Sequence, residues 1–270
     1  MLPQHHVVIS LLVAAAVQAG ALAAHSVRPR AMEACSGASA AVTALATLLA
    51  RGTYFPRQVA ASSLLACWGA RLSVHLARRD VESRLPARRL CVTRTLWAAL
   101  VALPVVAVNT LQAEPKPAGS LELAGAAAAL LGLALEAVAD AQKTAWHEAH
   151  PQRPGSGDAE PPVCAAGAWA WSRHPNLFGE MLFHAGLYAL VARVTPAVVA
   201  ASPVATVLTV AWLPTGPLKT LEREKFSLFA GYPAYLKYVA RTSLLLPVPP
   251  GAYAASRAAC PHFCEQACGV

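Results

Sequence analysis

Charged residues are scarce in this chain of 270 residues. They make up 13% of the sequence, against roughly 25% in an ordinary soluble domain, whereas hydrophobic residues make up 56%. This shortage of charge excludes an ordinary soluble domain and predicts an integral membrane protein. The apolar stretches are rich in Ala, Leu and Val and do not alternate with polar residues, so we expect an all-α helical bundle without a sheet.

Basic residues are absent ahead of the first apolar run, which follows Met1-Leu2-Pro3-Gln4-His5-His6. A secretory signal peptide normally begins with Lys or Arg. The small residues around Ala21 to Ala24 resemble a cleavage site, but the uncharged leader favours an uncleaved first membrane span.

The cysteines show no disulfide framework. Cys35, Cys67, Cys91 and Cys164 are scattered, which is typical of small apolar residues. Three more, Cys260, Cys264 and Cys268, recur every four residues and would share one face of a helix. We expect 251–270 to be a cytoplasmic tail that is either unmodified or S-palmitoylated. Zinc binding with His262 is the weaker alternative, because the spacing fits no usual zinc site, and no metal is expected.

Seven apolar segments are candidate membrane spans, although six is also compatible with the pattern. The second is shorter than the roughly 20 residues that a bilayer crossing needs. The segments are 7–24, 38–50, 59–77, 95–111, 119–139, 177–192 and 198–213.

The 22 Lys and Arg residues test this count, because basic residues collect on the cytoplasmic side. Seventeen lie on one side, in 25–37, 78–94, 140–176 and after 213, and four lie on the other side, with Arg71 inside a span. The division predicts seven crossings and a cytoplasmic C-terminus. Basic residues facing anionic lipid heads account for the net charge of +8, so no nucleic-acid partner is expected. The membrane would be the endoplasmic reticulum in a eukaryote and otherwise the plasma membrane.

Polar residues gather at the cytoplasmic ends of the later spans. We therefore assign 1–118 to a scaffold and 119–250 to the chemistry, with a Pro/Gly-rich loop at 150–162 as a candidate mobile flap.

The densest polar block opens the sixth apolar segment and reads Ser172-Arg173-His174-Pro175-Asn176-Leu177-Phe178-Gly179-Glu180. Ser172 as a helix cap would explain part of the block. Glu180 would lie inside the helix, where a carboxylate is expected to face a cavity or a cation. Arg173 suits a phosphate because its planar fork donates parallel hydrogen bonds, and Asn176 can both donate to and accept from a carboxamide.

Three other clusters share this side of the predicted membrane. Glu136 and Asp140 lie four residues apart, with Lys143 nearly on the same face. Asp140 and Lys143 are expected to form an exposed ion pair, whereas Glu136 lies inside the apolar run; alternatively, the three bind ribose, adenine and phosphate. Arg71, midway along a span, pairs with a carboxylate or a phosphate. The last cluster holds tyrosines: Tyr238 is expected to be an interfacial anchor, whereas Tyr232 and Tyr235 beside Glu222 are candidates to close a ligand pocket.

Together these clusters resemble an uncharacterised multi-pass membrane family grouped with the steroid 5α-reductase C-terminal domain. The resemblance covers roughly 60–250. The matching elements are Trp68-Gly69-x-Arg71-Leu72, Asp140-x-Gln142-Lys143, the block from Ser172 to Glu180, Gly216-Pro217-Leu218-Lys219-x-x-Glu222, and Tyr232-x-x-Tyr235 ending at Pro247.

The resemblance implies an NADPH-dependent reductase that saturates an activated carbon–carbon double bond of a steroid-like or fatty-acyl lipid. Asp140, Asn176 and Glu180 would match cofactor-contacting residues, and Lys143, Arg173 and Tyr235 complete the candidate cofactor site.

The chain departs from that family's pattern at several positions. Leu177 stands where Tyr is usual, and His184 stands where an aromatic residue is common. No Glu and Tyr in the early spans match the pair that polarises the substrate in steroid reductases, so the proton donor is unassigned.

Two other functions remain as alternatives. Isoprenylcysteine and phospholipid methyltransferases also carry an Arg-His-Pro block, so an S-adenosylmethionine-dependent methyltransferase using Glu222 and Glu224 is one. A lipid-binding membrane protein without catalysis is the other.

Overall fold

The computed structural model describes residues 31–78, 87–111, 117–150, 163–194 and 217–259, with a few positions between Val8 and Gly20. The described residues form helices and no strand, apart from one isolated bridge between Ser172 and Ser243. The all-α prediction is therefore confirmed for this part of the chain.

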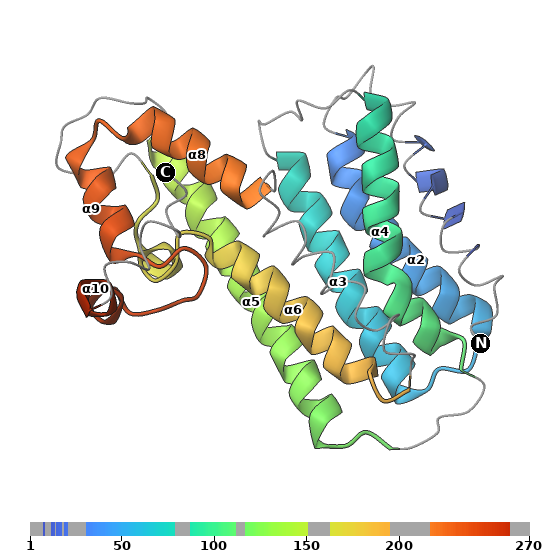
Figure 1. The fold of residues 1–270 in the computed structure, drawn as a ribbon. Helices are drawn as coiled ribbons and strands as arrows, with labels where there is room; N and C mark the ends of the chain where they lie inside the picture. The colour runs from blue at the N-terminus through green and yellow to red at the C-terminus, as the bar shows by residue number, and fades with distance from the viewer. Residues whose placement is uncertain are drawn as a thin grey trace. The chain divides into compact units, whose positions relative to one another are not determined.

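The helices lie along the chain as Figure 1 shows. They are α2 (Ala31–Arg51), α3 (Pro56–Arg78), α4 (Ala87–Asn109), α5 (Ser120–Ala149), the short 3₁₀ helix η1 (Gly167–Ala170), α6 (Pro175–Val191), α8 (Pro217–Phe229), α9 (Pro233–Arg241) and α10 (Pro250–Ala259).

Four of the described helices are long and apolar enough to cross a membrane, namely Ala34–Arg51, Pro56–Arg78, Arg89–Asn109 and Ser120–Ala149. They coincide with the predicted spans 38–50, 59–77, 95–111 and 119–139. Large apolar side chains such as Leu123 and Leu131 are 64% exposed on α5, and an outer face of this kind suits lipid. These helices support membrane insertion.

The other predicted spans differ in their outcome. The segment 177–192 is helical as α6, but α6 has 17 residues, fewer than the roughly 20 that span a bilayer unaided. The segment 198–213 and most of 7–24 lie outside the described residues. The count of seven crossings therefore stays a prediction.

Two compact units divide the chain, Met1–Leu130 with Phe183–Thr206, and Leu131–Leu182 with Val207–Val270. Their boundaries fall within α5 and α6. The predicted division into a scaffold, 1–118, and a region that carries the chemistry, 119–250, is a division by function. The compact units do not test it, so it stays a prediction.

Small and amide side chains hold the helices of the first unit together. A Cβ atom on Gly37 of α2 would clash with the carbonyl oxygen of Gly69 on α3, so these backbones touch directly. Asn109 at the end of α4 donates to the hydroxyl of Thr47 (3.0 Å) on α2. Gln58 on α3 donates to the carbonyl of Val108 (3.1 Å). Buried amides of this kind link neighbouring helices in an apolar medium.

An ionic cluster also belongs to the first unit. Both Arg57 and Arg193 approach the buried carboxylate of Glu122, with nitrogen–oxygen distances of 3.6 Å and 3.4 Å. The charge count places both arginines on the non-cytoplasmic side, and the structure brings them to one carboxylate at the start of α5.

Glycines set a close antiparallel contact between α5 and α6, which run side by side in Figure 1. In the first unit, a Cβ on Gly125 would lie 2.7 Å from the carbonyl oxygen of Gly186. In the second unit, a Cβ on Gly179 would lie 2.7 Å from the backbone nitrogen of Glu136. The two backbones therefore approach too closely for any side chain at these positions, and this contact positions the residues at the start of α6.

Candidate functional site

The candidate site belongs to the second unit, where the loop before α6 is fastened to α5. Trp169 donates from its indole nitrogen to the carbonyl of Ala139 (2.9 Å), and the side-chain oxygen of Gln142 accepts from the backbone nitrogen of Ala168 (2.9 Å). Gly167 has a φ of +61° and leaves no room for a Cβ beside Gln142, so this turn favours glycine. In the Asp-x-Gln-Lys element, Gln142 therefore supports the structure of the loop before α6.

Ser172 ties the same loop to the segment after α9. Its hydroxyl donates to the carbonyl of Leu245 (2.8 Å) and accepts from the backbone nitrogen of His174 (3.1 Å). The backbone nitrogen of Arg173 donates to the carbonyl of Ser243 (2.8 Å). The helix begins later, at Pro175. The helix-cap interpretation of Ser172 is therefore correct only in part: its hydroxyl accepts from the amide of His174 next to the helix start, but it also donates to Leu245 of a distant segment. Pro175 is the first residue of α6, a position at which proline is tolerated.

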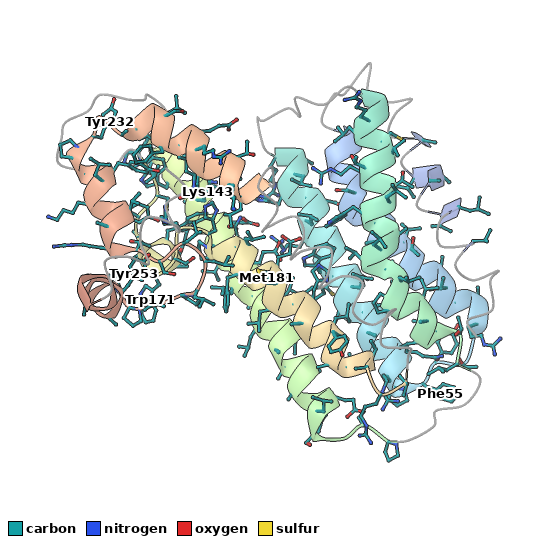
Figure 2. The ribbon with its side chains drawn as sticks, in the orientation of Figure 1. Phe55, Lys143, Trp171, Met181, Tyr232 and Tyr253 are labelled. Carbon is teal, nitrogen blue, oxygen red and sulfur yellow. The ribbon has the colours of Figure 1, made fainter. Side chains whose placement is uncertain are left out.

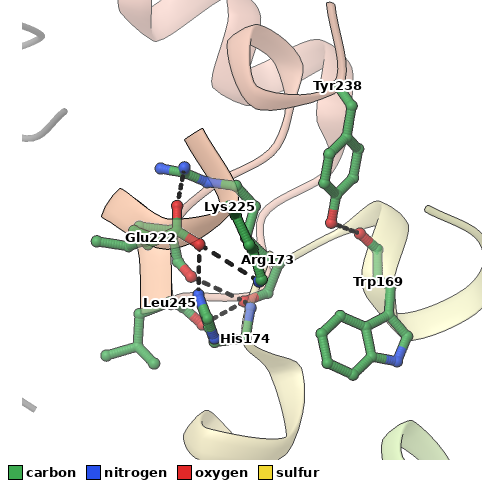
Figure 3. A network of polar contacts seen from close by, with 9 residues as sticks. Trp169, Arg173, His174, Glu222, Lys225, Tyr238 and Leu245 are labelled. Carbon is green, nitrogen blue, oxygen red and sulfur yellow. Dashed lines mark hydrogen bonds and ion pairs between the residues drawn. The ribbon is translucent and has the colours of Figure 1, made fainter. Parts of the chain in front are cut away.

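A buried ionic cluster forms where this loop meets α8 (Figure 3). The carboxylate of Glu222 accepts from the guanidinium of Arg173 through one oxygen. Its other oxygen lies 2.7 Å from Nε2 of His174 and 3.4 Å from Nζ of Lys225. The side chains of Arg173 and His174 are 8% and 7% exposed. In such an environment a charge is stable only when it is paired.

The cluster shifts the pKa values of its members. Burial lowers the pKa of His174 to about 4, against the opposing effect of the carboxylate, so the ring is neutral at pH 7 and its Nε2–H donates. Burial alone would raise the pKa of Glu222, but the hydrogen bond from His174 and the charge of Arg173 lower it to about 2. Burial also lowers the pKa of Lys225. One carboxylate thus faces two cationic side chains, and positive charge is in excess.

Two tyrosines of α9 lie inside the second unit. Tyr235 is 2% exposed, and burial with the nearby Glu222 charge raises its pKa to about 12. Tyr238 donates to the carbonyl of Trp169 (2.9 Å), and burial raises its pKa. The interfacial anchor predicted for Tyr238 is replaced by an internal hydrogen bond to the loop before α6.

The other predicted site residues gather on the facing parts of α5 and α6. Asn176 donates from its amide nitrogen to the carboxylate of Asp140 (3.1 Å), although 36 residues separate them. Lys143 places its ammonium 5.2 Å from the centre of the Trp169 ring, a distance typical of a cation–π contact; Figure 2 labels it. Glu136 is buried and Glu180 is half-buried on the same two helices.

The six predicted cofactor residues therefore all lie in the second unit, and the structure pairs Asp140 with Asn176 and Arg173 with Glu222. Arg71 is on α3 in the first unit. Tyr232 is half-buried, with its ring centre 6.2 Å from that of Phe229.

The sequence pattern did not indicate that His174 and Lys225 are partners of Glu222, or that Gln142 supports the loop. Each contact except that of Lys225 joins residues at least 26 positions apart, so no local spacing indicated it. The sequence did carry one general indication of these contacts. Its few charged residues stand among apolar residues, and an ionised group in such surroundings needs a partner.

Within the described residues, no group of three His, Cys, Asp or Glu side chains is placed to hold a metal ion. What the site offers is a mixed set of groups: carboxylates and a carboxamide on α5 and α6, and ammonium and guanidinium groups with excess positive charge beside them. Such a set suits a ligand that carries both anionic and hydrogen-bonding parts.

Comparison with known proteins gives one family. No curated protein and no solved structure matches the chain at significance. A family described as a protein of unknown function, DUF1295, matches residues 22–242, most of the chain. The match includes all four apolar helices and every candidate site residue. The chain therefore belongs to the DUF1295 family.

Proposed function

We propose that this protein is a membrane-embedded, NADPH-dependent reductase that saturates an activated carbon–carbon double bond of a steroid-like or fatty-acyl lipid. The observation that carries the proposal is the hydrogen bond from Asn176 to Asp140. It joins the two elements, Asp-x-Gln-Lys and Arg-His-Pro-Asn, on which the resemblance to the steroid 5α-reductase C-terminal domain depends.

The chemistry of the available groups fits a nicotinamide dinucleotide. Asp140 can accept from ribose hydroxyls, and the Asn176 amide can pair with the carboxamide of nicotinamide. Lys143 and the positive excess around Arg173 and Lys225 suit phosphates. Nε of Arg173 is buried without a hydrogen-bond partner among the described residues, so this guanidinium has a donor left for a phosphate oxygen although Glu222 holds its other side.

NADPH would supply a hydride, and the lipid double bond would take up that hydride together with one proton from water. The protein's own contribution is to hold and orient the reactants and to exclude water. Glu180 is half-buried on α6, one turn after Asn176, and under this proposal it would orient the nicotinamide end of the cofactor.

The methyltransferase alternative is less well supported. It needs Glu222 as a free carboxylate for a cationic sulfonium cofactor, but Arg173, His174 and Lys225 all contact Glu222. A carboxylate with three cationic or donor partners has little attraction left for another cation.

Thermal unfolding of the detergent-purified protein tests the proposal. Relative to the ligand-free protein, NADPH should stabilise by about 2.7 kcal/mol at a concentration of about 100 times its Kd, and NADH at the same concentration should stabilise less. Asn176→Ala and Lys143→Ala should reduce this gain. Lys237→Ala is the matched control, since it removes one positive charge from an exposed position of the same unit, and it should keep the full gain. Equal unfolding temperatures with and without either nucleotide would remove the reductase proposal, and stabilisation by S-adenosylmethionine instead would favour the methyltransferase.

A further inference from the structure

His184 is a fully buried polar side chain within the first unit. It is 0% exposed, and neither ring nitrogen has a hydrogen-bond partner among the described residues. An imidazole always carries at least one N–H donor, and a buried polar group without a partner is costly, particularly in a membrane helix. A buried histidine in this state needs an explanation, and a ligand that supplies the missing partner is one.

Aromatic rings surround this histidine. The ring centre of Trp68 on α3 lies 4.9 Å from that of His184, nearly perpendicular at 73°, and Phe183 lies 5.1 Å away at 76°. Trp68 also stacks on Phe183 at 5.5 Å and 11°, and Trp97 of α4 is 5.5 Å from Trp68. We call Trp68, Trp97, Phe183 and His184 the aromatic cluster.

The position of the aromatic cluster is fixed by helix packing. Trp68 precedes Gly69, whose contact with Gly37 leaves no room for a side chain between α2 and α3. Trp68 and Phe183 are both fully buried. The rings of Trp68 and Phe183 are therefore held in place by the packing around them.

We propose that the aromatic cluster binds the carbonyl end of the lipid substrate, with the His184 N–H donating to the carbonyl oxygen and the aromatic rings contacting the apolar body. The inference rests on the proposed function for the identity of the ligand as a substrate. When a conjugated double bond is reduced, negative charge collects on the carbonyl oxygen, so an N–H donor suits this end of the ligand.

The structural alternative is that His184 only packs as an aromatic ring. The two interpretations differ in the effect of His184→Phe. If His184 only packs, the wild type should show the same preference between an apolar ligand and its carbonyl analogue as His184→Phe shows. A histidine that donates to the carbonyl would distinguish the two ligands, because only one of them has an oxygen to accept the hydrogen bond.

Competition binding to the full-length protein in detergent tests this without nucleotide. The probes are tritiated cholestenone, a steroid enone, and hexadecenal, a fatty enal. The competitors are the same two compounds and the hydrocarbons cholestene and hexadecene, which lack the oxygen. For at least one pair, the wild type should bind the carbonyl compound about ten times more tightly than the hydrocarbon, and His184→Phe should bind both within a factor of two. His184→Gln, which still donates a hydrogen bond, should keep part of the preference.

Unfolding of the ligand-free variants provides the second readout. His184→Phe should unfold at or above the wild-type temperature, since it removes a buried donor that lacks a partner. A clear loss of stability in His184→Phe, an unchanged carbonyl preference in that variant, or no binding of either probe by the wild type would overturn the inference. Normal stabilisation by NADPH together with such a result would reject the role of His184 alone, whereas absent NADPH stabilisation would reject the proposed function.

Discussion

At the level of single residues, ionised and polar groups of this protein find partners far away in the sequence. Glu222 is the clearest case, because its partners Arg173 and His174 are 49 and 48 residues distant. The sequence indicated that Arg173, Asn176 and Glu180 need an explanation. The resemblance assigned Asn176 and Asp140 to one candidate site, but the hydrogen bond between them was not predicted. The ion pair between Glu222 and Arg173 was not predicted, because nothing in the sequence near either residue indicates the contact.

His174 makes folding sensitive to acid. Its pKa falls from 6.5 to about 4 in the folded state, so the unfolded chain binds the extra proton first. The stabilisation is fully present above pH 6.5 and is lost as the pH falls toward 4, by about 3 kcal/mol at 1.36 kcal/mol per pKa unit. Urea titration in mild detergent between these pH values measures the loss.

The matched variant is His174→Gln, whose amide can still donate to Glu222 but does not titrate. It should flatten the decline of the unfolding free energy between pH 6.5 and 4, leaving the contribution of carboxylates such as Glu222, whose pKa of about 2 affects stability below pH 4.5. An equally steep decline in His174→Gln would assign the acid sensitivity to other groups.

At the scale of helices, the hydrophobic pattern predicted where the four apolar helices lie and left their ends uncertain. The segment 119–139 was predicted, but α5 continues to Ala149. Residues 140–149 include the good helix formers Ala, Gln, Lys and Glu, but they are too polar to be counted as part of a membrane segment. The pattern also gave no reason to pair α5 with α6. That pairing comes from glycines on the two helices, and a glycine identifies its partner only in three dimensions.

Gly125→Ala tests the helix pair. Its new Cβ would lie 2.7 Å from the carbonyl oxygen of Gly186, and backbone atoms cannot move aside as a flexible side chain can. The variant should lose about 1–3 kcal/mol, as overpacked sites do, when unfolding is followed by circular dichroism.

Gly251→Ala is the control for the same exchange in α10, where no atom lies within 4 Å of the new Cβ. It should be neutral or stabilising by up to about 1 kcal/mol, the helix propensity difference between the two residues. Equal effects of the two substitutions would show that the close contact between α5 and α6 does not exist in the protein.

At the scale of the whole molecule, the account depends on which face of the membrane carries the site, because NADPH is supplied from the cytosol. The 17 to 4 division of Lys and Arg places 140–176 on the cytoplasmic side. Arg57 and Arg193, which the same count places on the opposite side, share the carboxylate of Glu122 in the structure.

Reporters in the loops test this orientation. An acceptor site for glycosylation inserted in 112–118 should be modified, and a protease added to the cytoplasmic face should cleave a recognition site inserted in 150–162. The insertions exchanged between the two loops are the controls and should give neither signal. Glycosylation of 150–162 would place Arg173, Asn176 and Glu180 away from the cytosolic NADPH and would remove the mechanism.

Hydride transfer to a lipid is the most direct test of the central claim. Membranes containing the protein are incubated with NADPH that carries deuterium at the transferable position, and the extracted lipids are analysed by mass spectrometry. The account predicts a saturated lipid that gains one deuterium with the wild type and not with Glu180→Gln, while Glu148→Gln, an exposed site on α5, behaves as the wild type. Deuterium in no lipid, or equal labelling by Glu180→Gln and the wild type, would contradict it.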